Sequence, residues 1–170
     1  MPRHFLAVWP DARSAAALAE VGVKVAAESG GKAVPAQKIH LTLAFLGEID
    51  AAAHEAALDA ANSQRSRPFG LAVDTIGSFK RARVGWAGLA HPPAGLLDLQ
   101  SALDSALRAR GFALDRRPFA PHITLARKIA RTVPPGSIPE IAWQVDAFTL
   151  VRSDTGTGRY VVEERWELGI

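Results

Sequence analysis

The chain has 170 residues, of which 48% are hydrophobic and 22% charged, with a formal net charge of +3 and a sequence pI of about 9.7. These values are ordinary for one globular domain, and the basic balance is compatible with a polyanionic partner. The absence of cysteine excludes disulfides, thiolate metal sites and a cysteine nucleophile. No apolar run is long enough to span a membrane, and the run over 5–9 is too short for a signal peptide, so we expect a cytoplasmic protein.

The predicted elements begin with a strand over residues 4–9. Asp11 has the side chain of an N-cap, and the alanine-rich helix expected over 15–28 should end at Gly30-Gly31. A strand over 38–46 and a second alanine-rich helix over 51–63 follow. Strands over 69–79 and 83–89 come next, with Lys80-Arg81-Ala82 as a hairpin connection.

The second half begins after the helix-breaking segment His91-Pro92-Pro93. An amphipathic helix is predicted over 96–110, with its apolar positions at Leu96, Leu99, Leu103 and Leu107. A strand over 122–127 and a proline-rich loop over 133–139 lead to a closing hairpin of strands over 143–152 and 159–168. No low-complexity linker interrupts this order, so we predict a single domain over 1–170 with a faint internal duplication.

One tetrapeptide, His40-Leu41-Thr42-Leu43, recurs as His122-Ile123-Thr124-Leu125, with one copy in each half of the chain. Successive side chains of a strand point to opposite faces, so each copy presents its His and Thr together and turns the residue between them toward a core. One copy alone would favour a half-buried structural histidine. Two matched copies, on strands that face each other across a cleft, favour a site with two imidazoles and two hydroxyls.

Such a site has the groups that hydrolysis of a cyclic phosphodiester requires. One imidazole can activate water while the other protonates the departing alkoxide on the opposite side of the phosphorus. The hydroxyls of Thr42 and Thr124 can donate to the non-bridging oxygens, whose charge grows in the transition state. Neither an HExxH motif nor a carboxylate-rich cluster lies near either copy, so we expect catalysis without a metal or other cofactor. The pattern alone leaves open which histidine is the acid and which the base.

Arg127 closes the second motif strand, and Phe45 stands at the equivalent offset in the first. A guanidinium at this position could clamp a phosphate through two hydrogen bonds or stack on a base. Both positions are odd relative to the His and Thr, so an ideal strand would point them to the opposite face. A strand end or a β-bulge would return them to the motif face, and a purely structural role is the alternative.

The segments around the motifs resemble a known family. Residues 38–47 (KIHLTLAFLG) resemble the first HxTx signature of the 2H phosphoesterases, and residues 118–127 (PFAPHITLAR) resemble the second, including its trailing arginine. Within that superfamily they are most similar to the RNA 2′,3′-cyclic phosphodiesterases, also called 2′-5′ RNA ligases. The resemblance spans essentially the whole chain, although Gly85 stands where an apolar side chain is more usual and is expected to loosen its strand.

The resemblance implies an α+β fold of two pseudo-symmetric antiparallel sheets that flank a central cleft, with helices outside. It also implies cleavage of RNA or nucleotide 2′,3′-cyclic phosphates to 2′-phosphate ends, with 2′-5′ ligation as the same chemistry in which an RNA 5′-hydroxyl replaces water. By the order of the motifs, His40 would donate a proton to the leaving O3′ and His122 would accept one from water. The other implied site residues are Thr42 and Thr124, which would hold the phosphate, and Arg127, Phe45 and Phe119, which would bind the substrate.

We therefore expect a monomeric enzyme whose partner is RNA with 2′,3′-cyclic phosphate ends or a cyclic nucleotide, not a membrane. Two alternatives stay open. One is an RNA-end-binding module with little catalysis, which the basic pI and the arginines near the second motif would suit. The other is the same chemistry on a different cyclic phosphate or on a 2′-5′-linked oligonucleotide.

The remaining histidines and tryptophans are predicted to be structural. We expect His4 at the surface or at a sheet edge, His54 without a partner at metal-ligand spacing, and His91 in a solvated loop. The tryptophans of the predicted strands, Trp86, Trp143 and Trp166, are expected in the core. Lys80-Arg81 and Arg83 form a hairpin tip that would suit either an RNA backbone or an ordinary solvated turn.

Overall fold

The computed structural model describes residues 1–169. Along the chain it has these elements: β1 (Arg3–Val8), α1 (Ala12–Ser29), β2 (Lys32–Ala33), a short 3-10 turn (Ala36–Lys38), β3 (Leu41–Gly47), α2 (Ala51–Asn62), β4 (Phe69–Phe79), β5 (Val84–Gly88), α3 (Ala94–Ala109), β6 (His122–Arg127), β7 (Gly136–Val145), β8 (Ala147–Asp154) and β9 (Arg159–Glu167). None of the helices in the described part of the chain combines the length and the apolar character needed to cross a bilayer.

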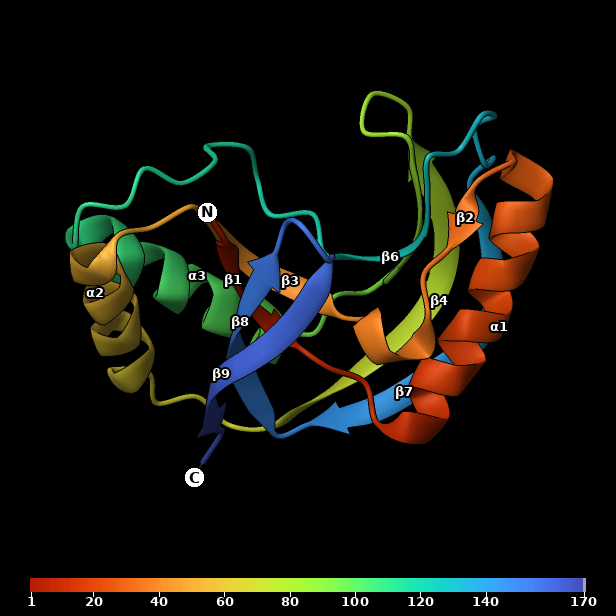
Figure 1. The fold of residues 1–170 in the computed structure, drawn as a ribbon. Helices are drawn as coiled ribbons and strands as arrows, with labels where there is room; N and C mark the ends of the chain where they lie inside the picture. Colours follow the sequence, from red (N-terminus) through yellow and green to blue (C-terminus); the bar gives the residue numbers. More distant parts are fainter. Residues whose placement is uncertain (170) are drawn as a thin grey trace.

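The strands form an antiparallel sheet in the order β7-β4-β5-β6-β3-β1-β8-β9, with β2 paired to the side of β6 (Figure 1). This order divides into two halves of four strands each, β7-β4-β5-β6 and β3-β1-β8-β9. A single residue pair between β3 and β6, Leu41 with Ile123, joins them. The expected α+β fold is thereby confirmed, and the two antiparallel sheets that were expected are joined as the two halves of one sheet.

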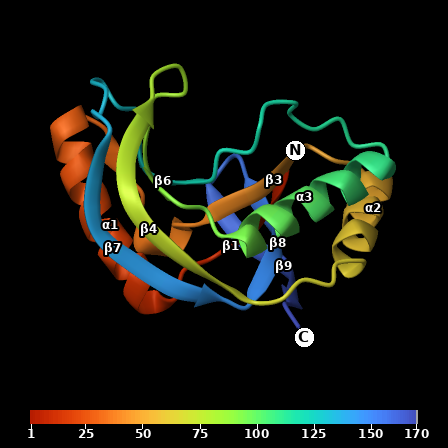
Figure 2. The same ribbon diagram turned by 180° about the vertical axis from the view of Figure 1, so that it is seen from behind.

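The helices lie outside the two halves of the sheet. Helix α1 packs on the half that contains β5, β6 and β7, while α2 and α3 pack together beside β3 in the other half (Figures 1 and 2). The four leucines predicted for the buried stripe of α3 are all fully buried. Asp11 caps α1 as predicted, because its carboxylate accepts a hydrogen bond from the amide of Ser14 at 2.7 Å.

Helix α1 approaches the sheet closely at two glycines. A Cβ on Gly22 would lie 2.9 Å from the carbonyl oxygen of Leu125, and one on Gly85 would lie 2.6 Å from Cγ1 of Val25. We expected Gly85 to loosen its strand, and the structure instead shows that the glycine makes room for Val25 of α1. Because Gly85 has no side chain, α1 packs directly against β5 and against the neighbouring motif strand β6.

Two predictions about the last third of the chain were wrong. The single strand expected over 143–152 is broken at Asp146, because β7 pairs with β4 in one half and β8 pairs with β1 and β9 in the other. The loop expected over 133–139 ends earlier, since β7 begins at Gly136 and includes Pro139. Strand β7 lies at the end of the sheet, and its register with β4 shifts beside Pro139, so the missing N–H of the proline removes no regular ladder bond.

Candidate active site

The two motif strands meet at the residue pair that joins the halves of the sheet. Leu41 of β3 pairs with Ile123 of β6, and both side chains are fully buried. Because neighbouring side chains in a strand point to opposite faces, the His and Thr of each motif project to the other side, where all four are half-buried. The fold therefore brings the two predicted pairs together on one face, which we call the motif face.

Each motif histidine is oriented by the backbone two residues upstream. Nδ1 of His40 lies 2.8 Å from the carbonyl oxygen of Lys38, and Nδ1 of His122 lies 3.0 Å from that of Ala120. A carbonyl oxygen only accepts, so Nδ1 must donate in both rings, which leaves Nε2 as the reactive nitrogen. In neutral His40 this nitrogen accepts a hydrogen bond from the hydroxyl of Thr42 at 3.1 Å.

Aromatic rings enclose His40. Phe5 stacks on its imidazole with ring centroids 4.8 Å apart, and the rings of Trp9 and Tyr160 approach at 5.2 and 5.6 Å. Trp9 is itself held in place, because its Nε1 donates a 2.8 Å hydrogen bond to the hydroxyl of Thr149. This enclosure keeps water away from His40 on several sides.

The enclosure has an electrostatic consequence. Burial lowers the pKa of His40 from 6.5 to about 4, and the positive charges of Arg127 and His122 act in the same direction. The hydrogen bond to the carbonyl of Lys38 opposes the shift, since it stabilises the imidazolium, but it is the weaker influence. His40 is therefore neutral in the free protein at pH 7.

His122 has more open surroundings than His40. One aromatic ring approaches it, that of Phe79, edge-on at 5.0 Å, and Phe79 in turn tilts against Trp86 at 5.6 Å. Phe79 is 37% exposed. Two tetrapeptides that are almost identical in sequence thus hold histidines in different environments, one enclosed and one accessible.

Arg127 reaches the motif face because β6 contains a bulge. The ladder between β5 and β6 shifts register, and the consecutive residues Leu125 and Ala126 are both buried. One extra residue reverses the alternation, so exposed Arg127 projects on the same side as His122. Its charge also lowers the pKa of His40, which places its guanidinium within electrostatic reach of that histidine.

An equivalent bulge occurs in β3. The ladder between β1 and β3 shifts register, the consecutive residues Leu43 and Ala44 are both buried, and Phe45 is 58% exposed. A bulge begins three residues after each motif histidine, and this shared irregularity removes the parity difficulty for Phe45 as well as for Arg127. Phe119, by contrast, is half-buried and packs against the hydrophobic core.

The expectations for two other histidines were wrong. His4 is only 5% exposed and lies on β1, a strand with neighbours on both sides. Its Nε2 lies 3.0 Å from a carboxylate oxygen of Glu163, and Nε2 of His54 lies 2.9 Å from the same oxygen. Strand β1, helix α2 and strand β9 supply these three residues, and only the tertiary structure brings them together.

This trio is also the one place in residues 1–169 where three potential metal ligands converge, with their ligand atoms within 4.8 Å of one another. It is separate from the motif face. His4 and Phe5 are neighbours in a strand and point to opposite faces, and Phe5 stacks on His40. The trio therefore contributes no side chain to the motif face.

The other sequence candidates are distributed as follows. Trp143 is buried as expected, while Trp86 and Trp166 are half-buried, and Trp166 donates a 2.7 Å hydrogen bond to Asn62. Two hollows, of about 240 and 430 Å³, lie beside Arg83 and Trp166 respectively, and neither is lined by a motif histidine. His91 is exposed in its loop.

Sequence reasoning missed the aromatic residues around the motif histidines. Phe5, Tyr160 and Phe79 lie on strands that are remote in sequence from the motif they contact, and no spacing rule connects them. A weak signal existed for Tyr160, the single tyrosine of the chain, but nothing linked it to His40.

Comparisons with known proteins identify the family and the fold of the chain. The model of the 2′-5′ RNA ligase superfamily matches residues 8–157. The chain is 40% identical over 144 residues to the RNA 2′,3′-cyclic phosphodiesterase of Escherichia coli K12, covering 81% of this chain and 80% of that protein. It is 33% identical over 168 residues to the RNA 2′,3′-cyclic phosphodiesterase of Thermus thermophilus, covering 89% and 82%. The crystal structure of E. coli LigT complexed with 3′-AMP superposes over the whole of both chains with a TM-score of 0.84 at 36% identity.

Proposed function

The chain belongs to the 2′-5′ RNA ligase superfamily, and we propose that it hydrolyses RNA 2′,3′-cyclic phosphates to 2′-phosphates with His40 and His122 as the acid–base pair. The observation that carries the proposal is the meeting of the two motifs at Leu41 and Ile123. That pairing puts two backbone-oriented imidazoles on one face, each with its Nε2 free of backbone contact.

In the proposed reaction His122 is the base. With Nδ1 committed to the carbonyl of Ala120, its Nε2 carries the lone pair that accepts a proton from water. The water oxygen bonds to phosphorus as the bond from phosphorus to O3′ breaks, and His40 gives its Nε2 proton to the departing O3′. The products are a 2′-phosphate and a free 3′-hydroxyl, with the proton transferred from one histidine to the other overall.

The low pKa of His40 requires that this proton arrive with the substrate. Neutral His40 accepts from Thr42 in the free protein. A phosphate anion on the motif face would stabilise the imidazolium and would compensate the charge of Arg127, which otherwise opposes protonation. Substrate binding then also protonates His40, because the negative charge of the bound phosphate stabilises the imidazolium that will donate the proton to O3′.

Arg127, Thr42 and Thr124 are proposed to hold the phosphate. The bulge in β6 directs the guanidinium to the motif face, where it can donate to two phosphate oxygens at once. The threonine hydroxyls can donate to the non-bridging oxygens as their charge grows. Phe45, at the matching bulge of β3, is exposed and is proposed to contact the nucleotide base, and Phe119 is proposed to support the substrate from the loop before β6.

We further propose that the reaction runs without a metal ion or other cofactor, because these side chains supply both proton transfers and the positive charge. The same attack on the cyclic phosphate by an RNA 5′-hydroxyl in place of water, with O3′ again leaving, would join ends through a 2′-5′ linkage. Since all the proposed groups come from one chain, we propose that the monomer is sufficient, and the cytoplasm is the proposed location. Sedimentation at assay concentrations and localisation of a tagged protein would test these two points.

The experiment that tests the function uses a short RNA that ends in a 2′,3′-cyclic phosphate. Conversion to a 2′-phosphate, identified by resistance of the product to a 3′-specific phosphatase, is the expected result, with activity retained in EDTA. His40→Ala and His122→Ala should each lower turnover by about 10²–10⁴-fold. Tight binding of this RNA without turnover would instead favour a module that sequesters RNA ends. Turnover of 2′-5′-linked dinucleotides, with none of the cyclic phosphate, would identify the 2′-5′ linkage as the substrate.

A further inference from the structure

Positive charge is concentrated in two parts of the sequence. Residues 75–97 and 116–139 contain no Asp or Glu, whereas the whole chain has 17. These two segments carry eight of its 20 Lys and Arg residues: Lys80, Arg81, Arg83, Arg116, Arg117, Arg127, Lys128 and Arg131. A formal charge of only +3 therefore conceals a strongly basic region.

The fold brings most of these cations to one end of one half of the sheet. Strands β5 and β6 are paired, with Val84 opposite Arg127, so the turn between β4 and β5 lies beside the end of β6 (Figure 1). Five exposed cations follow this end beyond Arg127, and we call them the basic rim: Lys80, Arg81, Arg83, Lys128 and Arg131. Among the described residues, none of the five forms an ion pair with a carboxylate.

Two members of the rim, Arg83 and Arg131, donate side-chain hydrogen bonds to backbone carbonyls, Arg131 through its Nε to that of Glu28 at 3.1 Å. Nε of Arg83 donates to the carbonyl of Ile129 at 3.0 Å, and its Nη2 donates to that of Lys128 at 3.3 Å. Both Arg83 and Lys128 have φ values in the left-handed region, 57° and 56°, which is uncommon for residues with long side chains and often marks functional segments. A hollow of about 240 Å³ lies between Lys80, Arg83 and Arg131.

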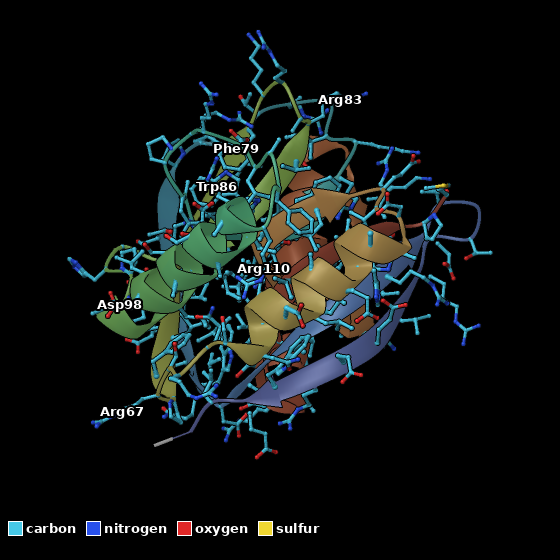
Figure 3. The ribbon with its side chains drawn as sticks, turned by 90° about the vertical axis from the view of Figure 1, so that its left-hand side faces the viewer. Arg67, Phe79, Arg83, Trp86, Asp98 and Arg110 are labelled. Carbon is cyan, nitrogen blue, oxygen red and sulfur yellow. The ribbon has the colours of Figure 1, made fainter. Side chains whose placement is uncertain are left out.

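An exposed aromatic ring connects the rim to the site. Phe79, the last residue of β4, immediately precedes Lys80, and its ring contacts the imidazole of His122 at 5.0 Å. Figure 3 shows Phe79 and Trp86 near Arg83, with Arg67 at the opposite end of the molecule. The rim begins at Lys128, which follows β6 and lies six residues beyond His122, or about 20 Å along the chain at the rise of a strand.

We propose that the basic rim and Phe79 form the path for the single-stranded RNA that leads to the cyclic phosphate, with Phe79 stacking on a base near the reacting end and the rim binding the upstream phosphates. The combination of a basic track with an exposed aromatic platform is what single-stranded nucleic acid requires. The proposal rests on the proposed function and deepens it: the protein acts on the ends of oligonucleotides in preference to cyclic mononucleotides, which cannot reach the rim.

The test compares two substrates, adenosine 2′,3′-cyclic monophosphate and a five-nucleotide RNA that ends in the same adenosine cyclic phosphate. The double variant Lys80→Ser with Arg81→Ser removes two rim cations whose side chains make no hydrogen bond or ion pair in the described structure. The matched control, Arg13→Ser with Arg67→Ser, removes the same charge away from the rim, from two side chains that likewise make no hydrogen bond or ion pair in the described structure. Arg83 and Arg131 are left intact because their hydrogen bonds support the backbone.

The wild-type protein should have the higher kcat/KM on the oligonucleotide. The rim variant should lose roughly tenfold on that substrate at low salt and nothing on the mononucleotide, while the control keeps both values. Loss of two single-strand phosphate contacts should also flatten the plot of log kcat/KM against log salt by about 1.4. An unchanged ratio between substrates in the rim variant, or an equal loss in the control, would overturn the proposal.

Failure of the proposed function gives a different pattern, because the wild-type protein would then turn over neither substrate. In that case, fluorescence anisotropy with the five-nucleotide RNA carrying a 2′-phosphate decides the question. Weaker binding by the rim variant than by the control supports the RNA path, and equal binding by the two rejects it.

Discussion

In the free protein, His40 should titrate far below neutrality, and it should gain a proton when a nucleoside 2′-phosphate binds. Its pKa of about 4 means that roughly one molecule in a thousand carries the imidazolium at pH 7. The cause is enclosure by Phe5, Trp9 and Tyr160, aided by the positive charge of Arg127. A proton donor to O3′ cannot operate from that state, so the bound phosphate must change it.

The charge of the phosphate is large enough for this change. One negative charge about 4 Å from the imidazolium, at an effective dielectric constant of about 20, contributes about 4 kcal/mol. That energy is worth about a thousandfold in the protonation equilibrium, which brings the pKa of His40 to near neutrality. The same phosphate offsets the charge of Arg127, and this second contribution has the same sign.

The measurement is an NMR titration of the histidine ring signals, with and without saturating adenosine 2′-monophosphate. The signal of His40 is assigned by its loss in His40→Gln. The reasoning is refuted if His40 is already protonated at pH 7 in the free protein. A pKa that stays low in the complex would reject His40 as the proton donor and would exchange the roles of the two histidines.

Three further outcomes are expected. A cyclic substrate with sulfur in place of O3′ should restore most of the activity of His40→Ala but not of His122→Ala, because a thiolate departs without a proton. Equal recovery in both variants would contradict the assignment of His40 as the acid and His122 as the base. Folding lowers the pKa of His40 from 6.5 to about 4, so between these pH values the unfolded chain binds more protons than the folded one. The free energy of unfolding should therefore fall by up to about 3 kcal/mol as the pH drops through that range. Urea unfolding of His40→Gln should lack this pH-dependent loss. Gly22→Ala should reduce the free energy of unfolding by about 1–3 kcal/mol, since its Cβ would lie 2.9 Å from the carbonyl oxygen of Leu125; an unchanged melting temperature would show that α1 can move away.

The sequence carried much of the site by itself. The alternation of side chains in a strand was enough to pair each motif histidine with its threonine and to bury Leu41 and Ile123, because that alternation is a local property of the backbone. The capping of α1 by Asp11 and the buried leucine stripe of α3 followed from local rules in the same way. The repeat also predicted that the two strands would meet, and they do so at a single residue pair.

Only the tertiary structure decided the direction of Arg127 and Phe45. Their offset argued against the motif face, and the answer depended on two bulges that arise where β6 meets β5 and where β3 meets β1. A bulge is a mismatch between two strands, so neither strand specifies it alone. The break at Asp146 has the same origin, because the partners of β7 and β8 lie in different halves of the sheet.

The difference between the two histidines was likewise decided by packing. In sequence the motifs are nearly identical, and the residues alone allowed either histidine to be the acid. The fold places three aromatic rings around His40 and one beside His122, drawn from strands far apart in the chain. A pKa depends on the solvent and charge around a group, which are properties of the assembled structure, so the chemical asymmetry of the site appears only once the chain has folded.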